Sequence, residues 1–327
     1  MQLLVLNGDD VRALLPMGEC IGLMRGALAL APASGTVQPI RTGIPAPGGR
    51  GGMGLMPGAI DDPARLGIKI VTVFPGNHGG PLGSHQGMVL LFDAANGAPL
   101  AVIEARALTA IRTAAASAAA TDVLARGETD VLAVLGCGDQ GAAHLDALPR
   151  VRRFERLLVW GRDPDKTVAF AATQSKRLGR RIEAVGSVKE AARLADILCA
   201  VTSAAEPILE GAWLRPGHHL NLVGSSVPTT AEIDSQAVAR GRWFVDYEPS
   251  ARALSGEFRR AVAAGVIGED HLLGAVGEVI AGTIPGRISE ADITIFKSLG
   301  MAAEDLVTAD FLLSAAEARG VGQRIEW

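Results

Sequence analysis

A glycine-rich motif near the middle of the chain constrains its fold more than any other feature. Residues 136–141 read Gly-Cys-Gly-Asp-Gln-Gly and fit the pattern G-x-G-x-x-G. They directly follow the apolar segment Val131–Leu135 and open a predicted helix over 139–148, and a second apolar segment, Arg156–Trp160, comes next. In this strand–turn–helix–strand setting, glycines let the backbone approach a pyrophosphate at a helix N-terminus. The motif predicts a dinucleotide-binding domain; the alternative is a plain glycine turn in a cofactor-free α/β domain.

The chain has 327 residues, a length that suits two domains. The pattern of its apolar segments differs between the two parts of the sequence. Before residue 105 the strands read as an antiparallel sheet, with a tight turn at Asn96-Gly97. After residue 129 strands alternate with helices, which predicts an α/β fold with a doubly wound parallel sheet. The predicted strands cover 67–74, 87–93, 99–104, 131–135, 156–160, 196–201 and 219–223.

Two helices are expected to connect the domains. One covers 105–126 and contains the crossover, and the other covers 290–320 and returns the chain to the first domain. A further helix is expected over 18–30, and the proline- and glycine-rich stretch 39–58 reads as a long loop. We therefore predict a nucleotide-binding Rossmann domain from 116–302 and a first domain from 1–115 plus 303–327.

Position 161 distinguishes the two nicotinamide dinucleotides. In folds that bind NAD, an acidic residue about 20 positions beyond the glycine motif binds the ribose 2′-hydroxyl. Here Gly161 stands at that point, so no carboxylate would repel a 2′-phosphate, and Arg162 supplies a guanidinium that can pair with one. Asp163 precedes Pro164 and reads as the cap of the next helix. The sequence therefore predicts NADP(H) as the cofactor.

Charge and composition exclude other classes of protein. The formal net charge is −4 without a basic run, so no nucleic-acid partner is expected. The apolar runs are shorter than the roughly 18–20 residues needed to cross a bilayer, and the N-terminal run is too short for a signal peptide. Three dispersed cysteines, Cys20, Cys137 and Cys199, suggest reduced thiols in the cytoplasm. No metal is expected, because zinc-site spacing is absent and the adjacent His218 and His219 cannot both face one ion from a strand.

Three basic residues are candidates for holding an anionic substrate. Lys69 lies in a strand with two largely apolar faces, where it is either a desolvated lysine with a lowered pKa or a snorkelling edge lysine. Arg112 lies in a helix among small side chains that leave room for an anionic ligand; the alternative is a stem lying over the helix surface. Arg41 lies in the glycine- and proline-rich stretch and by itself indicates only a solvated arginine.

Six segments in sequence order carry these residues and further motifs. They are Gln38–Thr42, Leu55–Pro57, Lys69–Thr72, Ser84–Gln86, Leu108–Thr113 and Phe296–Met301. Together they resemble the ornithine cyclodeaminase/mu-crystallin family over nearly the whole chain. The resemblance leans toward the mu-crystallin branch of NADPH-dependent ketimine reductases.

The resemblance implies roles for individual residues. Arg41, Lys69 and Arg112 would surround the substrate carboxylate, and Met56, Ser226 and Leu299 would lie along the substrate. It also implies a homodimer built through the sheets of the first domain, which would bind the substrate. Together with the glycine motif and position 161, it implies a cofactor site of His85, Arg112, Thr113, Gly136, Gly138, Asp139, Gln140, Gly161, Arg162, Thr202, Val223 and Ser298.

One departure distinguishes the branches of the family. The cyclodeaminases carry an aspartate in the turn after a late strand, where this chain has Ser226. A serine hydroxyl without a partner base is a poor general base, so ornithine chemistry is disfavoured while hydride transfer is unaffected.

The sequence thus predicts an enzyme that reduces a small 2-imino acid to the L-amino acid with NADPH. We expect a cyclic substrate such as 1-pyrroline-2-carboxylate or 1-piperideine-2-carboxylate. Lys69 is the favoured catalytic proton donor, and a bound water is the alternative. Three rival interpretations remain: an amino-acid dehydrogenase acting on a 2-oxo acid with ammonia or an amine, an ornithine cyclodeaminase, and a non-catalytic NADPH-dependent binder of a small ligand.

Overall fold

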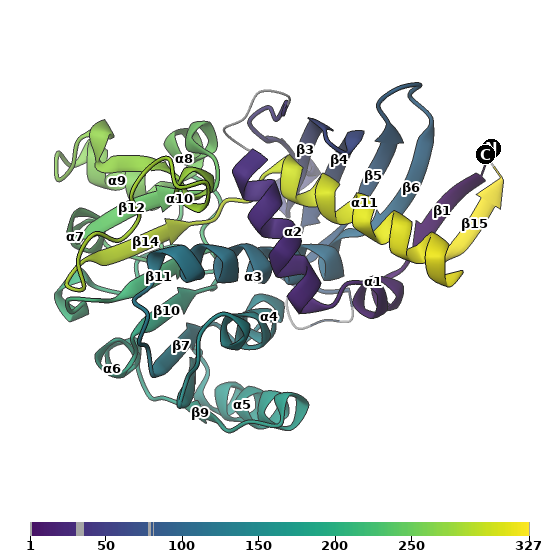
Figure 1. Ribbon diagram of the computed structural model, residues 1–327. Coiled ribbons are helices and arrows are strands. Elements are labelled where there is room, and N and C mark those ends of the chain that lie inside the picture. The colour runs from purple at the N-terminus through teal and green to yellow at the C-terminus, as the bar shows by residue number, and fades with distance from the viewer. Residues whose placement is uncertain (1, 31–35, 78–79, 81, 327) are drawn as a thin grey trace. The chain divides into compact units, whose positions relative to one another are not determined.

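A computed structural model describes residues 2–30, 36–77, 80 and 82–326 of the chain. The chain forms two compact units. Unit 1 holds the residues up to Arg112 and from Gly300 onward, and unit 2 holds Thr113–Leu299. The chain therefore enters unit 2 once and returns to unit 1 near its end, as the colours of Figure 1 show.

Unit 1 consists of a sheet and a few helices. Its elements are β1 (Gln2–Leu6), α1 (Gly8–Leu14), α2 (Met17–Leu30), β2 (Thr42–Pro45), β3 (Gly52–Asp61), β4 (Ala64–Val73), β5 (His85–Asp93), β6 (Pro99–Glu104), the start of α3 (Ala105–Leu124), α11 (Ala302–Arg319) and β15 (Gln323–Glu326).

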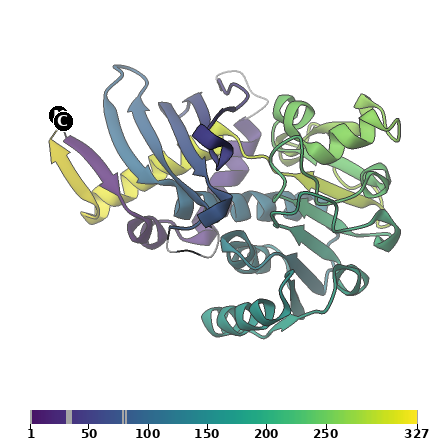
Figure 2. The same cartoon turned by 180° about the vertical axis from the view of Figure 1, so that it is seen from behind.

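The seven strands of unit 1 pair in the order β15-β1-β6-β5-β4-β3-β2. The sheet is antiparallel from β2 to β6, as predicted. The pair β1–β6 is parallel and makes the whole sheet mixed. Both termini of the described chain lie at one edge of this sheet, in the adjacent strands β1 and β15 (Figure 2).

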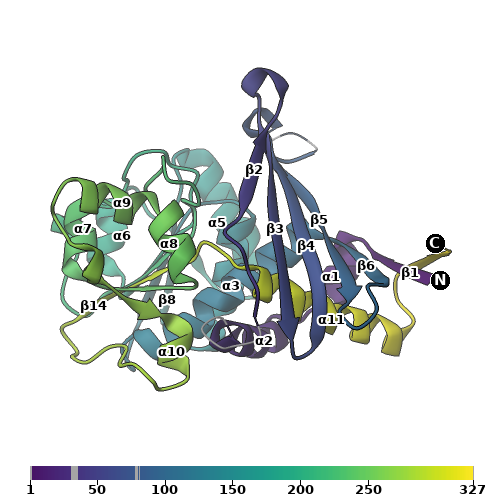
Figure 3. The same cartoon turned by 90° about the horizontal axis from the view of Figure 1, so that it is seen from above.

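Helix α11 runs across one face of β3–β6, and α2 packs against it (Figures 1 and 3). Two strand glycines admit the helix. A Cβ at Gly58 would lie 2.5 Å from the Cβ of Ala302, and one at Gly67 would lie 2.5 Å from Cδ2 of Leu306. The expectation of a long loop over 39–58 is therefore wrong for most of the stretch, which forms the hairpin β2–β3. Its glycines suggested a loop, but glycine also occurs in a strand where another element comes close.

The opposite face of this sheet, called the outer face below, is apolar. Side chains alternate along β4, so Leu66, Ile68 and Ile70 point away from α11. Ile70 pairs with Met88 of β5. Met88 is 44% exposed and Leu66 is 42% exposed. Exposed apolar surface of this kind is typical of an interaction surface.

Unit 2 alternates strands and helices. Its elements are the end of α3, β7 (Val131–Leu135), α4 (Asp139–Ala147), β8 (Arg156–Trp160), α5 (Pro164–Leu178), β9 (Ile182–Ala184), α6 (Val188–Leu194), β10 (Ile197–Ala200), β11 (His219–Leu222), α7 (Ser235–Arg240), β12 (Gly241–Val245), α8 (Glu248–Leu254), α9 (Gly256–Ala263), β13 (Leu272–Ala275), α10 (Val276–Ile280) and β14 (Ile293–Lys297).

The eight strands of unit 2 pair in the order β13-β12-β14-β11-β10-β7-β8-β9, and all pairs are parallel. Helices α4 and α5 lie on one side of the sheet and α6 lies on the other (Figure 1). The predicted doubly wound parallel sheet is confirmed. The chain order reverses at β7, and dinucleotides bind at such a switch point, outside the carboxyl ends of the strands.

The helix predicted over 290–320 is wrong in its first part. Ile293–Lys297 is the strand β14, and helix α11 begins only at Ala302. All five residues of β14 are buried, so no alternation of apolar and polar residues distinguishes the strand from a buried helix. The helical part belongs to unit 1.

Among the described helices, none by itself has the length and apolar composition to cross a membrane. Helices α1 and α2 reach this length and apolar composition only when they are taken together, and the two are bent by 87° relative to each other.

Candidate active site

Lys69 lies at the centre of the sheet of unit 1, on the face that α11 covers. It pairs with Met56 of β3 and with Val89 of β5. Its Nζ lies 3.0 Å from Oδ1 and 2.8 Å from Oδ2 of Asp305, in the first turns of α11. Both side chains are buried. Lys69 is therefore a desolvated lysine with a buried counter-ion, and not a snorkelling edge lysine.

Arg112 contacts the same carboxylate. Its Nε lies 3.0 Å from Oδ1 of Asp305, and its Nη1 donates to Oε2 of Glu304. Arg112 is only 3% exposed. The space that small neighbours leave around this arginine is thus occupied at least in part by carboxylates of the same chain. The expectation that the space is open to an external anion is corrected to this extent.

Arg41 completes the cationic group. Its Nη2 lies 3.5 Å from the carbonyl oxygen of Gly300, in the turn that leads into α11. Gly300 has a positive φ of 79°, and a Cβ there would lie 2.9 Å from Nη2 of Arg112. Glycine is therefore required at this turn, and the turn keeps both arginines near the start of the helix. The structure brings Arg41, Lys69 and Arg112 together.

The surroundings of Lys69 change its acidity. Its pKa is lowered to about 8: burial is the largest cause, the charges of Arg112 and Arg41 act in the same direction, and Asp305 opposes the shift. A lysine with this pKa can release and regain a proton near neutral pH. The group in unit 1 can therefore attract a small anion and exchange a proton.

Two other residues expected in unit 1 are placed differently. Met56 is buried beside Lys69 in the neighbouring strand. His85 opens β5 opposite Val73, four residues along β4 from Lys69, which is roughly 13 Å. Its Nδ1 lies 2.9 Å from Oγ of Ser84. The structure therefore brings Met56 to Lys69 and leaves His85 apart.

The glycine motif forms a tight turn between β7 and α4. Gly136 has a φ of 134°, and a Cβ there would lie 2.7 Å from the carbonyl oxygen of Val201. A Cβ at Gly141 would lie 2.2 Å from the carbonyl oxygen of Gly136. Around Gly138, the N-cap of α4, a Cβ would meet nothing within 4 Å. Two glycines thus close the turn, and the third leaves room for a pyrophosphate where Asp139 and Gln140 begin the helix.

The other expected cofactor residues follow neighbouring strands of unit 2 at the same edge of the sheet. Thr202, Val223 and Ser298 come directly or almost directly after β10, β11 and β14. The hydroxyl of Ser298 is buried and has no hydrogen-bond partner in the described part of the chain. A ligand that offers a polar atom at this edge would satisfy it. Both this hydroxyl and the open turn at Gly138 fit a dinucleotide.

Gly161 and Arg162 follow β8 at that edge. A Cβ at Gly161 would lie 2.6 Å from Oγ1 of Thr167 and 2.7 Å from Sγ of Cys137. No side chain, and therefore no carboxylate, fits at position 161 without displacing these atoms. Arg162 is exposed.

Three expected residues lie near the limits of unit 2 or in its loops. Thr113 is buried in α3, as the first residue of the unit. Leu299 is the last, and its backbone N–H donates to Oδ2 of Asp246 at 2.6 Å. Ser226 is half-buried in the loop after β11.

Sequence reasoning missed the two carboxylates that accompany the basic residues. Glu304 and Asp305 are adjacent acids in a segment that is otherwise apolar, Ala302–Leu306, and both are buried. Adjacent acids at the start of an apolar helix were the signal, because buried acids require partners. Among the described residues, no group of three or more histidine, cysteine or acidic side chains could hold a metal. The three cysteines are free.

A model of the ornithine cyclodeaminase/mu-crystallin family matches residues 1–320. Δ1-Pyrroline-2-carboxylate reductase of Bacillus cereus is 34% identical over 326 residues, which are 99% of this chain and 100% of the relative. Ketimine reductase mu-crystallin of Mus musculus is 38% identical over 278 residues, 85% of each chain. The solved Δ1-pyrroline-2-carboxylate reductase of Thermococcus litoralis, in complex with NADH and L-proline, has a TM-score of 0.95 and 35% identity and covers 98% of this chain and 100% of its own.

Proposed function

This chain belongs to the ornithine cyclodeaminase/mu-crystallin family, and we propose that it reduces the C=N bond of a small 2-imino acid with a nicotinamide cofactor. The product is the L-amino acid. Cyclic imines with a carboxylate beside the C=N bond, 1-pyrroline-2-carboxylate and 1-piperideine-2-carboxylate, are the preferred substrates. The similarity to reductases of this class over nearly the full chain supports the proposal.

The buried group in unit 1 is the observation that carries the proposal. Lys69, Arg112 and Arg41 bring three positive charges, and Glu304 and Asp305 bring two negative ones. The group as defined by these five residues has one excess positive charge. A substrate with a single carboxylate balances it.

Each unit has its own part in the proposed reaction. In unit 2 the turn of Gly136 and Gly138 would hold the pyrophosphate of a nicotinamide dinucleotide, which would supply the hydride for the carbon of the C=N bond. In unit 1 Arg41 and Arg112 orient the substrate carboxylate. Lys69 gives a proton to the imine nitrogen, so that one C–H and one N–H bond form, and it then regains a proton from water. A bound water is the alternative donor when the imine arrives protonated.

The test is the consumption of NADPH and of NADH with five- and six-membered cyclic imino acids. Parallel reactions contain 2-oxo acids with ammonia or methylamine, and ornithine with catalytic NAD⁺. We expect turnover with the cyclic imines to exceed the other reactions. Faster turnover of an oxo acid with an amine would replace the proposal by an amino-acid dehydrogenase, and ammonia released from ornithine would replace it by a cyclodeaminase. Tight binding of a ligand without oxidation of either cofactor would indicate a binding protein.

The pH dependence of kcat/KM reports on the proton donor. Because the pKa of Lys69 is lowered to about 8, the donor loses its proton above that pH, and kcat/KM is expected to fall about tenfold per pH unit on that side. In Lys69→Arg the guanidinium stays protonated, so the decline near pH 8 should disappear. A decline that is unchanged in the variant would belong to the substrate imine or to water, and would remove Lys69 as the donor.

We also propose a homodimer, formed through the outer face of the sheet of unit 1. The partly exposed apolar side chains of this face support it. Met88→Arg places a charge on the face and is expected to shift the molecular mass measured by light scattering from dimer to monomer. The control is Leu273→Arg in unit 2, where a leucine is similarly exposed at 41%. A monomeric wild-type protein, or a Met88→Arg variant that remains dimeric, would contradict the proposal.

The location that we propose is the cytoplasm, and the three free thiols support it.

A further inference from the structure

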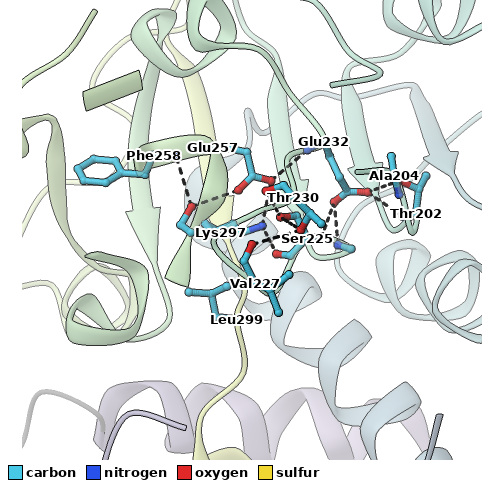
Figure 4. A network of polar contacts seen from close by, with 12 residues as sticks. Thr202, Ala204, Ser225, Val227, Thr230, Glu232, Glu257, Phe258, Lys297 and Leu299 are labelled. Atoms are coloured by element: carbon cyan, nitrogen blue, oxygen red, sulfur yellow. Dashed lines mark hydrogen bonds and ion pairs between the residues drawn. The ribbon is translucent and has the colours of Figure 1, made fainter. Parts of the chain in front are cut away.

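A buried carboxylate joins two loops of unit 2 (Figure 4). Oε1 of Glu232 accepts hydrogen bonds from the backbone N–H and from Oγ1 of Thr202, both at 2.7 Å. Oε2 accepts from the N–H groups of Gly224 at 2.7 Å and of Ser225 at 3.3 Å. Thr202 belongs to the loop after β10, and Gly224 and Ser225 belong to the loop after β11. One side chain thus holds the loops at the carboxyl ends of two neighbouring strands.

The two loops touch where the carboxylate holds them. A Cβ at Gly224 would lie 2.0 Å from the carbonyl oxygen of Thr202 and 2.5 Å from Oε1 of Glu232. Only glycine fits at this contact. The loops therefore approach each other too closely at this point to admit a side chain at position 224.

A second pair of charges supports the same contact from behind. The buried Nζ of Lys297 donates to the carbonyl oxygen of Ser225 at 2.5 Å and lies 3.2 Å from Oε1 of Glu257. The same oxygen of Glu257 accepts the N–H of Glu232 at 3.2 Å. Burial raises the pKa of the Glu232 carboxyl above its usual range, and the charge of Lys297 opposes the rise. Both loops are thus held by buried acidic and basic side chains in the interior of unit 2.

Such a network is costly as a purely structural device. Desolvating several charges costs several kcal/mol, and apolar side chains of similar volume often stabilise a core equally well. The paired residues of β10 and β11 end at Ala200 and Leu222, and beyond them the N–H groups of Val223 and Gly224 still donate to the carbonyl oxygen of Ala200. The hydrogen bonds of Glu232 therefore act on the loop residues that lie beyond the paired residues of the two strands.

These loops lie on the side of the switch point where a dinucleotide places its second half. The glycine turn follows β7, and β10 and β11 come next to it in the sheet, on the side away from β8. We propose that Glu232 is a positioning residue for the nicotinamide half of the cofactor, acting through Thr202 and the segment Gly224–Ser225. The inference rests on the proposed function, because it presupposes that unit 2 binds a nicotinamide dinucleotide.

The variant Glu232→Gln tests the inference. An amide keeps one acceptor oxygen and turns an NH2 group toward N–H donors, so at least one loop is released. We expect the Kd of NADPH to rise about tenfold, because the loss of one hydrogen bond to a charged group changes an equilibrium constant by about this factor. The Kd of 2′,5′-ADP, which lacks the nicotinamide and its ribose, is expected to change less than about twofold. Isothermal titration calorimetry measures both, and KM for NADPH should rise in parallel.

The control is Asp196→Asn in the same unit. Asp196 is also a nearly buried carboxylate, and its Oδ2 accepts the N–H groups of Asp130 and Val131 at 2.9 and 3.1 Å. It serves the amino ends of β7 and β10, at the opposite edge of the sheet. Its variant is expected to lower the melting temperature and to leave the ratio of the two Kd values unchanged.

A double variant, Lys297→Met with Glu257→Gln, removes one basic and one acidic group of the supporting pair together. Like Glu232→Gln, it should raise the Kd of NADPH more than the Kd of 2′,5′-ADP. If Glu232→Gln loses affinity for both ligands equally, or for neither of them, the inference is overturned. Failure of both variants to fold while Asp196→Asn folds would also overturn it, since Glu232 would then serve stability alone. A wild-type protein that binds neither NADPH nor NADH would overturn the proposed function itself.

Discussion

The Lys69→Met variant is expected to turn over a cyclic imino acid about 10²–10⁴-fold more slowly than the wild-type protein, because this is the usual contribution of a positioned proton donor. Methionine fills a similar volume in the buried site but carries neither charge nor proton. The loss should appear in kcat, because the proton donor is gone, and KM should rise as well, because the group without Lys69 no longer has an excess positive charge. Steady-state kinetics with saturating NADPH give the number.

Arg65→Met is the matched control for this experiment. Arg65 lies four residues before Lys69 in β4, on the same face of the strand. Its Nε contacts Oδ1 of Asp310 of α11 at 2.7 Å. The substitution thus removes another ion pair between the same two elements. We expect near wild-type turnover from it. Near wild-type turnover by Lys69→Met as well would disprove the role assigned to Lys69.

The second large effect concerns the choice between the two nicotinamide cofactors. We propose that Arg162 pairs with the 2′-phosphate of NADPH, while no carboxylate fits at Gly161 to favour NADH. Arg162→Ala should therefore weaken NADPH about 10–100-fold, as expected for the loss of charge-assisted hydrogen bonds, and leave NADH unchanged. Fluorescence titration with each reduced cofactor measures this.

Arg181→Ala provides the comparison, because Arg181 is also an exposed arginine of unit 2 and contacts Glu183 only at 3.9 Å. It should change the affinity for neither cofactor. If the wild-type protein binds NADH as tightly as NADPH, the assignment of Arg162 is wrong. The experiment is necessary because the solved Thermococcus litoralis relative is in complex with NADH.

Local patterns predicted much of the fold. The segments 131–135 and 156–160 are strands β7 and β8, and Asp163 caps the next helix by accepting the N–H of Lys166. Other elements depend on contacts between distant parts of the chain. In the glycine-rich β3, Gly58 leaves room for Ala302 of α11, and the buried β14 has the same apolar composition as a core helix. Nothing local in either segment reports on these neighbours.

The same limit applies to the site. The resemblance to a family supplied Arg41, Lys69 and Arg112, and the structure brings these three together in unit 1. Their counter-ions are more than 190 residues away in the sequence, which no spacing rule covers. Thr202 was expected near the cofactor, but the carboxylate that holds it, Glu232, lies 30 positions further on without any motif around it.

The return of the chain to unit 1 has a consequence for its synthesis. Lys69 and Arg112 leave the ribosome before the strands of unit 2, whereas Asp305, their shared counter-ion, follows those strands in helix α11. The nascent chain can complete the whole parallel sheet of unit 2 before that helix exists. The charged centre of unit 1 is therefore assembled only after the strands of unit 2 have been made, and a chain that stopped after β14 would hold Lys69 and Arg112 without their anions.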